Sequence, residues 1–358
     1  MAPKNRMNHS KRHPVIAEDL KFLLASNLPW ERFAGKTVLI TGAMGLVASY
    51  IVDALLYQNE ISDSEPCAVL ALVRDRERAE RKFSNHLGRS DLEFLVQDVI
   101  VPLPPQTRSD FIIHAAGNAT PLKFGQDPIG TYKAAVLGTH YLLEHAHLKH
   151  CEGFVLLSSG AVHGAVPGDD TVVNERVIGV IDPLDPYACY AESKRMAEAM
   201  CAAWARQNKL KTRICRLGHT YGPGLRRDDD RAFSEFVYSV LDQRDILLRT
   251  DGAAVRPYCY LMDAADAIFR VLLMGGDGEA YLVANETATC SIKELAETLA
   301  KLDYEKKIMV RVKREVSGAS IPNSDPARIL DTTKLRKLGW TPRFDINGGF
   351  ERTYRSLL

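Results

Sequence analysis

The sequence has no run of about 18 uncharged apolar residues, the length that a bilayer-spanning helix needs. The N-terminal stretch Met1–Arg12 is basic and polar, and it lacks the apolar centre of a secretory signal. The chain also has little excess charge, since 46 Lys+Arg against 45 Asp+Glu give a net charge of +1. A general nucleic-acid binder needs a basic surface. We therefore expect a cytoplasmic protein that binds neither a membrane nor nucleic acid.

Paired cysteines and metal-ligand spacings are missing as well. The seven cysteines are odd in number and scattered, with no CxxC pair, which favours reduced core thiols over disulfides. The ten histidines include no HExxH or Cys/His ligand spacing, so we expect no metal site. The chain does have 358 residues, of which 46% are hydrophobic. That is enough for one large α/β domain or for two domains that share an interface.

Short apolar runs alternate with amphipathic segments from residue 37 to residue 217. Apolar strands separated by helices are typical of a parallel sheet covered on both faces, with right-handed crossovers. We expect a doubly wound α/β fold whose ligand site lies at the carboxyl ends of the strands. The expected strands are 37–40, 68–73, 93–96, 111–114, 154–157 and 212–216, and the expected helices are 46–58, 132–148 and 187–207.

The alternation loosens after residue 217, where Gly222-Pro223-Gly224 marks a loop. We expect residues 218–358 to form mainly a smaller substrate-binding lobe, with some segments returning to the sheet domain of 36–217. A cleft between the two parts would hold the ligand. Residues 1–35 are expected to be an N-terminal extension with a short helix within 18–33. The elements expected in the lobe are helices at 232–241, 263–273 and 292–301 and strands at 246–248 and 258–261.

A glycine-rich turn joins the first strand to the first helix. Gly42 allows a tight turn and Gly45 lets the backbone approach a diphosphate, while the helix start presents free N–H groups to the anion. Ala48 stands where a third glycine is commonest, and it is small enough for close helix–strand packing. The position between strand and helix favours dinucleotide binding over a chance turn. We expect cofactor contacts from Gly42, Met44, Gly45 and Leu46.

The end of the second strand should lie at the adenosine ribose. Arg74 could pair with the 2′-phosphate of NADP, Asp75 could accept hydrogen bonds from the ribose of NAD, and Arg74 could equally be a solvated surface charge. These interpretations stay open, and with them the choice between NAD and NADP. Asp98 and Val99, after the third strand, suit an adenine contact, although Asp98 could instead cap its loop.

A tyrosine, a lysine and a serine pair form a candidate catalytic group. Tyr190 and Lys194 are four residues apart in a predicted helix, so their side chains share a face. An ammonium beside a phenol favours the phenolate and lowers its pKa from about 10, which would make Tyr190 an acid/base near neutral pH. Ser158 and Ser159 end the fifth strand, where a hydroxyl can hydrogen-bond a substrate oxygen. Alone, each pattern is also typical of a helix-surface pair or a strand end.

Five segments occur in the order found in one enzyme family. They are the glycine turn, residues 114–121 (HAAGNATP), Ser158-Ser159, Tyr190…Lys194 and Tyr221-Gly222-Pro223-Gly224. Together they resemble the extended short-chain dehydrogenase/reductase superfamily, and more narrowly its NAD-dependent nucleotide-sugar epimerase/dehydratase family, with UDP-glucuronate decarboxylase-like members nearest. The resemblance covers roughly residues 36–355. It implies that 36–217 is a Rossmann domain that binds NAD(P).

The resemblance also implies a Ser–Tyr–Lys catalytic set and a tightly held nicotinamide cofactor. Ser159 falls on the family's catalytic Ser/Thr, Tyr190 on its acid/base, and Lys194 on the partner that also holds the nicotinamide ribose. Arg231 and Arg256 fall where relatives clamp the diphosphate of the sugar nucleotide, and guanidinium groups suit phosphate oxygens. Further residues assigned by the resemblance are Ala115 and Ala116 for the cofactor, and Thr120 and His219 for the substrate.

The chain departs from the family where relatives carry extra acid/base groups. Family dehydratases have an Asp-Glu pair after the catalytic Thr, and decarboxylases have a Glu two positions after the Ser/Thr. Here those places are Gly160 and Ala161, which transfer no proton. Dehydration is disfavoured, and decarboxylation less strongly, because a β-keto acid needs mainly an electron sink. His163 replaces a Tyr, Ala135 an Asn, and His219 a substrate-contacting Asn, and these changes would reshape the sugar pocket.

The predicted function is an NAD(P)-dependent reaction on a nucleotide-activated sugar through a transient 4-ketone. With no further acid/base group, epimerisation is the simplest outcome. Net oxidation or reduction of a keto-sugar and UDP-glucuronate decarboxylation are the alternatives, and so is a non-catalytic NAD(P)-binding sensor on the same fold. The resemblance also predicts a homodimer through the helices at 132–148 and 187–207, both of which carry apolar stripes.

Overall fold

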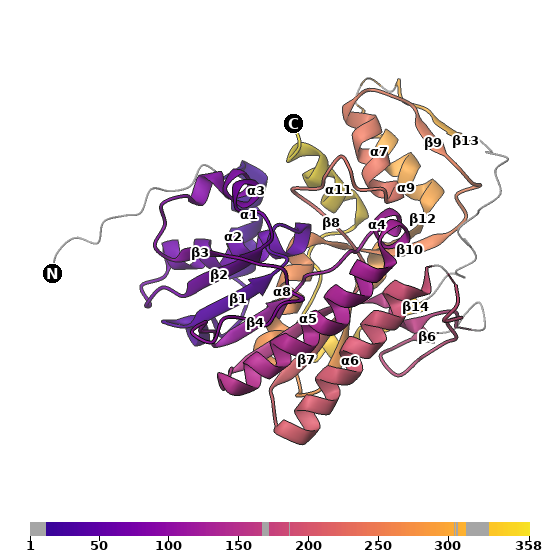
Figure 1. Ribbon diagram of the computed structural model, residues 1–358. Coiled ribbons are helices and arrows are strands. Elements are labelled where there is room, and N and C mark those ends of the chain that lie inside the picture. Colours follow the sequence, from indigo (N-terminus) through magenta and orange to yellow (C-terminus); the bar gives the residue numbers. More distant parts are fainter. Residues whose placement is uncertain (1–11, 167–171, 186, 304, 306, 313–328) are drawn as a thin grey trace.

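Seven parallel strands form the central sheet, and helices cover both of its faces (Figure 1). The computed structural model describes residues 12–166, 172–185, 187–303, 305, 307–312 and 329–358. The strand order is β11-β7-β5-β4-β1-β2-β3, so the order along the chain reverses between β1 and β4, the place where such sheets bind ligands. The strands are β1 Thr37–Thr41, β2 Ala68–Val73, β3 Leu92–Val96, β4 Phe111–His114, β5 Gly153–Ser159, β7 Thr212–Leu217 and β11 Glu279–Val283.

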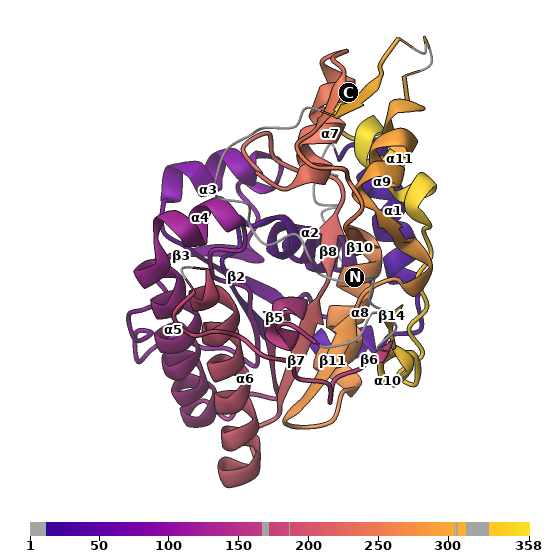
Figure 2. The ribbon, with the colours of Figure 1, turned by 90° about the vertical axis from the view of Figure 1, so that its right-hand side faces the viewer.

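The side chains of each strand alternate between two apolar clusters. Val38 and Ile40 of β1 belong to the cluster shared with the N-terminal helix and the two helices next to it, whereas Leu39 belongs to the cluster on the opposite face. This double coverage explains why the strands are almost wholly apolar. Figure 2 shows the two layers, which are α5 (Pro128–Leu148) and α6 (Ala188–Asn208) on one face and α1 (Pro14–Leu24), α2 (Leu46–Ile61) and α8 (Leu261–Met274) on the other.

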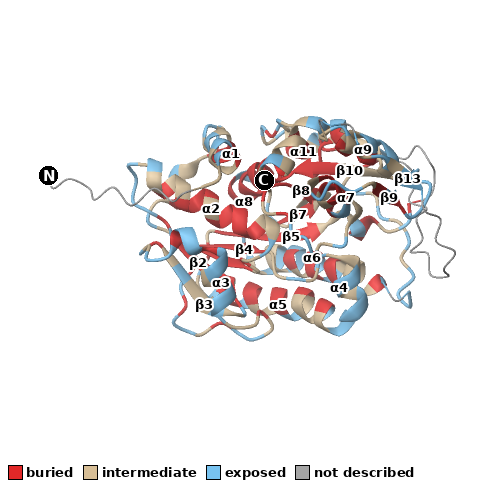
Figure 3. Ribbon diagram, turned by 90° about the horizontal axis from the view of Figure 1, so that it is seen from above, coloured by how far each residue is buried: buried red, intermediate tan, exposed pale blue. Residues whose placement is uncertain are grey.

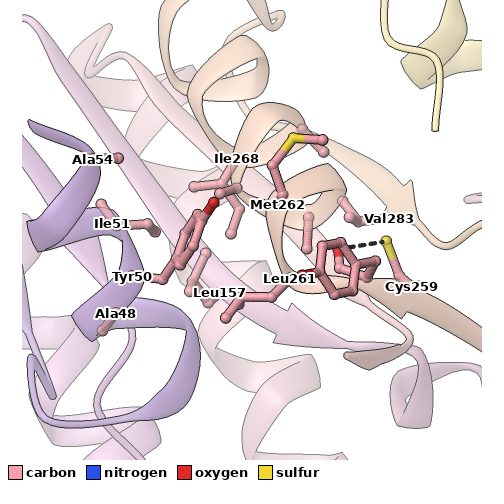
Figure 4. Packing of buried hydrophobic residues seen from close by; sticks show 14 of the residues in the cluster. Ala48, Tyr50, Ile51, Ala54, Leu157, Cys259, Leu261, Met262, Ile268 and Val283 are labelled. Atoms are coloured by element: carbon pink, nitrogen blue, oxygen red, sulfur yellow. Dashed lines mark hydrogen bonds between the residues drawn. The ribbon is translucent and has the colours of Figure 1, made fainter. Parts of the chain in front are cut away.

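Burial is concentrated in the sheet and in the helix surfaces turned toward it (Figure 3). In the cluster that includes α2 and α8, Tyr50 and Ile51 lie near Ile268 and Leu157 (Figure 4). Each of these side chains is at most 6% exposed. The resulting rigid platform fixes the carboxyl ends of β1, β4 and β5 relative to one another.

A smaller lobe lies beyond the carboxyl end of the sheet and is built around three short strands. In this lobe β10 pairs in parallel with β8 and antiparallel with β12. The lobe and the connections contain β8 His219–Tyr221, β9 Ile246–Leu248, β10 Val255–Tyr260, β12 Thr289–Ser291, β13 Val310–Val312, α7 Ala232–Leu241, α9 Ile292–Ala300, α10 Thr333–Arg336 and α11 Ile346–Arg355. Shorter elements elsewhere are α3 Arg76–Lys82, α4 Pro121–Gln126, β6 Val172–Val173 and β14 Ile329–Leu330.

The six strands expected from the sequence are present, with ends that differ by a few residues. The sheet also has a seventh strand, β11, which pairs with β7 and comes from the C-terminal third of the chain. The N-terminal helix begins at Pro14, with His13 as its cap, instead of at Glu18. Among the described residues, none of the helices is long and apolar enough to cross a bilayer.

Candidate active site

The turn between β1 and α2 can be formed only with glycine at its first position. Gly42 has φ +62°, and a Cβ there would lie 2.8 Å from the Cα of Ala116 and 3.0 Å from the carbonyl oxygen of Ala115. Gly45 is the N-cap of α2, and in the part of the chain that the structure describes no side chain caps its first amides. Ala48 is 1% exposed, as the close packing of α2 on the sheet requires. These residues fit the diphosphate of a dinucleotide, because open amides and room for backbone approach coincide at a helix start.

Thr41 and His114 connect the carboxyl ends of β1 and β4 next to this turn. The Thr41 hydroxyl accepts hydrogen bonds from the N–H groups of Ala115 and Ala116, both at 3.2 Å. It lies 2.8 Å from His114 Nδ1. Burial lowers the pKa of His114 to about 3, with the charge of Lys194 acting in the same direction, so the neutral ring accepts from the hydroxyl. The sequence analysis assigned no role to Thr41 or to the His114 side chain.

The residues expected at the adenosine already have partners of their own. Asp75 Oδ1 accepts from the N–H of Arg78 at 3.0 Å and so caps α3. The side chain of Arg74 is 75% exposed, and its Nη1 lies 4.0 Å from Asp98 Oδ2. Asp98 also accepts from the N–H of Ile100 at 3.2 Å, as expected for a loop cap. The neighbouring Val99 is buried. It packs against Gly138 of α5, where a Cβ would lie only 3.1 Å from the Val99 side chain.

Ser159, at the end of β5, and Tyr190, in the first turn of α6, lie together. The Ser159 side chain acts as a hydrogen-bonding group on the phenol. The Ser159 Oγ accepts from the N–H of Ala161 at 3.1 Å, which leaves its own proton free for an acceptor. Burial raises the pKa of Tyr190, while the Ser159 hydrogen bond and the charge of Arg231 act against that rise.

The expected net lowering of the Tyr190 pKa is wrong, and no effect of Lys194 on the phenol is resolved. The pKa of Tyr190 is raised, and Lys194 is not among the groups that shift it. The ammonium instead donates to the carbonyl oxygen of Leu157 at 2.8 Å. It lies close to the chain at Gly117, where a Cβ would be 3.9 Å from Nζ. Burial lowers the pKa of Lys194 to about 8. The spacing of four residues predicted a shared helix face, but it could not show which atom the ammonium contacts.

An aromatic ring that the sequence analysis did not single out covers the phenol. Phe124, from α4, stacks on the ring of Tyr190 with centroids 4.9 Å apart and planes at 10°. The first turn of this helix also contacts the smaller lobe, because the N–H of Leu122 donates to Asp230 Oδ2 at 2.7 Å. Thr120 is the N-cap residue of α4, although its side chain makes no capping bond. The short helix α4 therefore bridges the two parts of the site.

The three candidate substrate residues of the smaller lobe lie near one another. Burial lowers the pKa of His219 to about 3, and the charges of Arg256 and Arg231 act in the same direction. The Arg231 guanidinium pairs with Asp229, with Nε–Oδ1 at 2.9 Å and Nη2–Oδ2 at 2.5 Å. Arg256 Nη1 donates to the carbonyl oxygen of Val255, and its guanidinium forms no ion pair with any described residue. The structure thus brings both arginines to one neutral histidine, and Arg231 also to Tyr190.

At the positions that depart from the family pattern, glycine and alanine carry no group that transfers a proton, and the histidine is buried. Gly160 and Ala161 form the short turn after β5. His163 is 2% exposed, and its Nδ1 donates to the carbonyl oxygen of Val177 at 2.6 Å. Ala135 is buried in α5, where its carbonyl accepts from the Thr139 hydroxyl. No group of three or more His, Cys, Asp or Glu among the described residues is arranged to hold a metal ion.

Comparisons with known proteins match the chain to one enzyme family. Residues 38–284 match the model of the NAD dependent epimerase/dehydratase family. UDP-glucuronic acid decarboxylase 6 of Arabidopsis thaliana is 30% identical over 320 residues, which cover 87% of this chain and 86% of the relative. UDP-glucuronic acid decarboxylase 1 of Xenopus tropicalis is 29% identical, over 89% of this chain and 71% of the relative.

Two solved structures have the same fold along most of their length. A dTDP-glucose 4,6-dehydratase of Streptomyces venezuelae, solved with NAD bound, is 25% identical, with a TM-score of 0.73 over 89% of this chain and 96% of its own. A UDP-glucuronic acid 4-epimerase of Bacillus cereus, solved with UDP-glucuronic acid and NAD, is 21% identical, with a TM-score of 0.72 over 90% of this chain and 98% of its own.

Proposed function

The chain belongs to the NAD-dependent epimerase/dehydratase family of extended short-chain dehydrogenases/reductases, and from that premise we propose that it inverts C4 of a nucleotide-activated sugar through a transient 4-ketone. One observation carries the proposal. The Ser159 side chain acts on the phenol of Tyr190, while Gly160 and Ala161, in the turn after β5, carry no group that transfers a proton. A site with one acid/base can oxidise and reduce the same carbon, and the turn after β5 supplies no second group for an additional elimination step.

Different groups of residues would bind different parts of the cofactor. Gly42, Met44, Gly45 and Leu46 would hold the diphosphate, and Asp98 and Val99 would border the adenine. When bound, NAD supplies a reversible acceptor for the hydrogen of the sugar carbon. The residues that would hold the nicotinamide riboside are Ala115, Ala116, Tyr190 and Lys194. The exposed Arg74 would lie at the adenosine ribose and would also accommodate the additional phosphate of NADP.

Tyr190 moves the proton of the reaction. As the phenolate, it takes the proton from the C4 hydroxyl when the ketone forms, and as the phenol it gives this proton back when the carbon is reduced. Ser159, whose oxygen is fixed by the N–H of Ala161, donates to the ketone oxygen and holds it in place. Phe124 covers one face of the phenol, which keeps water from that face of the reacting oxygen.

The smaller lobe would bind the nucleotide diphosphate. Arg256 forms no ion pair with a described residue, and Arg231 is held by Asp229, so the two guanidinium groups converge with one local carboxylate between them. The diphosphate of a nucleotide sugar would supply negative charge to these two guanidinium groups. The neutral His219 and Thr120 would contribute hydrogen bonds to the sugar.

UDP-glucuronate decarboxylation is the second candidate, because the relatives that share about 30% identity are UDP-glucuronic acid decarboxylases. Incubation of the protein with NAD and UDP-glucuronic acid or UDP-glucose, followed by proton NMR of the products, separates the outcomes. A C4 epimer supports the proposal, whereas a UDP-pentose with release of CO2 supports decarboxylation.

The variant Tyr190→Phe is the control for the chemistry. It should abolish turnover and leave NADH binding, measured by fluorescence titration, within about threefold of wild type, because the aromatic ring and the other cofactor-binding residues stay in place. An activity that survives this substitution unchanged would show that Tyr190 is not the base. Binding of NADH without turnover of any nucleotide sugar by the wild-type protein would favour a sensor.

A further inference from the structure

Side chains of α6 contact not only the catalytic serine at the end of β5 but also the two residues before it. Lys194 donates to the carbonyl oxygen of Leu157 at 2.8 Å. The next residue, Ser158, donates its hydroxyl proton to Glu198 Oε1 at 2.5 Å. The residue after that is the catalytic serine, which meets the phenol from the same helix. Three consecutive strand residues are therefore held by three side chains of α6, and Glu198 is the member to which the proposed reaction gives no role.

A buried arginine from the neighbouring strand fixes this carboxylate. Arg216 of β7 is the register partner of Ser158 on β5. Its Nε lies 3.1 Å from both carboxylate oxygens of Glu198, and its Nη2 lies 2.7 Å from Oε2. Arg216 Nη1 donates to the carbonyl oxygen of Glu175 at 2.8 Å. The two charged side chains are 8% and 10% exposed. Burial of such a pair adds little net stability, whereas it sets the geometry of β5, α6 and β7 tightly.

We propose that Glu198 is a positioning residue for the catalytic set. Through Ser158 it fixes the end of β5, so that Ser159 meets the phenol at the required place. Through its charge it keeps the ammonium of Lys194 protonated in buried surroundings. This inference rests on the function proposed above, since it gives Glu198 a role in that same reaction.

The groups that face Lys194 show why one carboxylate decides its charge. They are Glu198 and Cys201 on α6 and His114 on β4. Burial raises the pKa of the Cys201 thiol and lowers that of His114 to about 3, so both are neutral near pH 7. Burial lowers the pKa of Lys194 to about 8, and Glu198 is the first group that opposes this. Without the carboxylate, two buried cations, Lys194 and Arg216, would remain, and the ammonium would lose its proton at lower pH.

The experiment compares Glu198→Gln with Glu198→Asp and Ser158→Ala by pH profiles of kcat and kcat/KM. For Glu198→Gln we expect a roughly tenfold lower kcat. The alkaline limb of the profile, which reports loss of the Lys194 proton, should move to lower pH by about one unit. Glu198→Asp keeps the charge and should restore the position of the limb. Ser158→Ala should lower kcat without moving the limb, because both charges stay. KM for the nucleotide sugar should change less than about twofold in all three variants.

The matched control is Asp266→Asn, which breaks a buried ion pair of the same kind on α8. Asp266 and Arg270 are 10% and 7% exposed, and their atoms lie 2.8 Å apart. This pair is remote from Lys194, so its loss should lower the melting temperature about as much as Glu198→Gln does and leave the pH profile unchanged. If both variants lower the melting temperature and neither moves the profile, Glu198 has only a structural role and the inference is overturned.

A second measurement does not depend on turnover. The carbon-13 signal of the Lys194 ε-methylene, assigned by its loss in Lys194→Arg, should titrate near pH 8 in the wild-type protein and at lower pH in Glu198→Gln. An unchanged midpoint would contradict the role of the charge. A lowered midpoint in a protein that turns over no nucleotide sugar would leave this role standing and refute the proposed function, so the two failures are distinguishable.

Discussion

At the scale of single residues, the phenol of Tyr190 is subject to opposing effects. Burial raises its pKa, and the Ser159 hydrogen bond and the positive charge of Arg231 lower it. The charge that favours the phenolate therefore comes from the smaller lobe and not from the lysine on the same helix. This arrangement couples the acid/base to the residue that would bind the substrate diphosphate.

Arg231→Gln tests this coupling. Loss of the charge should raise the pKa of Tyr190 further, so the acid limb of kcat/KM should move to higher pH by roughly one unit. KM for the nucleotide sugar should rise about tenfold, because one phosphate ligand is lost. Arg227→Gln is the control, since Arg227 pairs with Asp242 on the exposed surface. An Arg231→Gln enzyme with the KM and pH profile of the wild type would refute the assignment.

The resemblance to the family was sufficient to predict that Tyr190, Lys194 and Ser159 share one site, whereas helix periodicity alone predicted only that Tyr190 and Lys194 share a helix face. It was not sufficient for the sign of the Tyr190 pKa shift. That sign depends on how much water tertiary packing removes and on a charge from another lobe. Phe124 was missed for a related reason, since its contact with Tyr190 is set by the path of the chain into α4.

At the scale of elements, the β1–α2 turn links local backbone geometry to cofactor binding. Gly42→Ala places a methyl group 2.8 Å from the Cα of Ala116 at a positive φ. We expect the free energy of unfolding to fall by about 1–2 kcal/mol from the backbone conformation alone and further from the clash. NADH binding should weaken at least tenfold. Gly88→Ala is the control, because its φ is also positive, +82°, and a Cβ there meets nothing within 4 Å. Equal urea midpoints and equal NADH affinities for the two variants would refute this account.

The order of elements was largely predictable, and their assignment to layers was not. Apolar runs identified six strands of the sheet, while β11 was missed because its five residues begin with a charged one and follow a glycine-rich loop. Helix α8 was expected near residues 263–273 as part of the smaller lobe. It begins at Leu261, and residues such as Ile268 belong to the apolar cluster that includes α1 and α2. Periodicity shows that a helix has an apolar face, but only tertiary structure shows what that face covers.

At the scale of the whole molecule, the outer surfaces of α5 and α6 expose large apolar side chains. Ile129, Tyr132 and Leu148 of α5 and Met196 of α6 are between 43% and 73% exposed. We propose that these helices pair with those of a second copy in a homodimer, which would bury this surface. Light scattering after size exclusion should give twice the mass of 39.8 kDa. Met196→Glu should give the monomer mass, whereas Leu87→Glu, exposed elsewhere, should not. A monomeric wild-type protein at micromolar concentration would contradict the proposal.

The most direct test of the central claim uses a nucleotide sugar that carries deuterium at C4, such as UDP-glucuronic acid or UDP-glucose. Oxidation and reduction at one carbon, with Tyr190 as the acid/base, predict a product with inverted C4 that retains its deuterium, and no product with Tyr190→Phe. NMR of the product reports both the configuration and the isotope. An inverted product that has lost its deuterium to water, or one that Tyr190→Phe forms at the wild-type rate, would contradict the account.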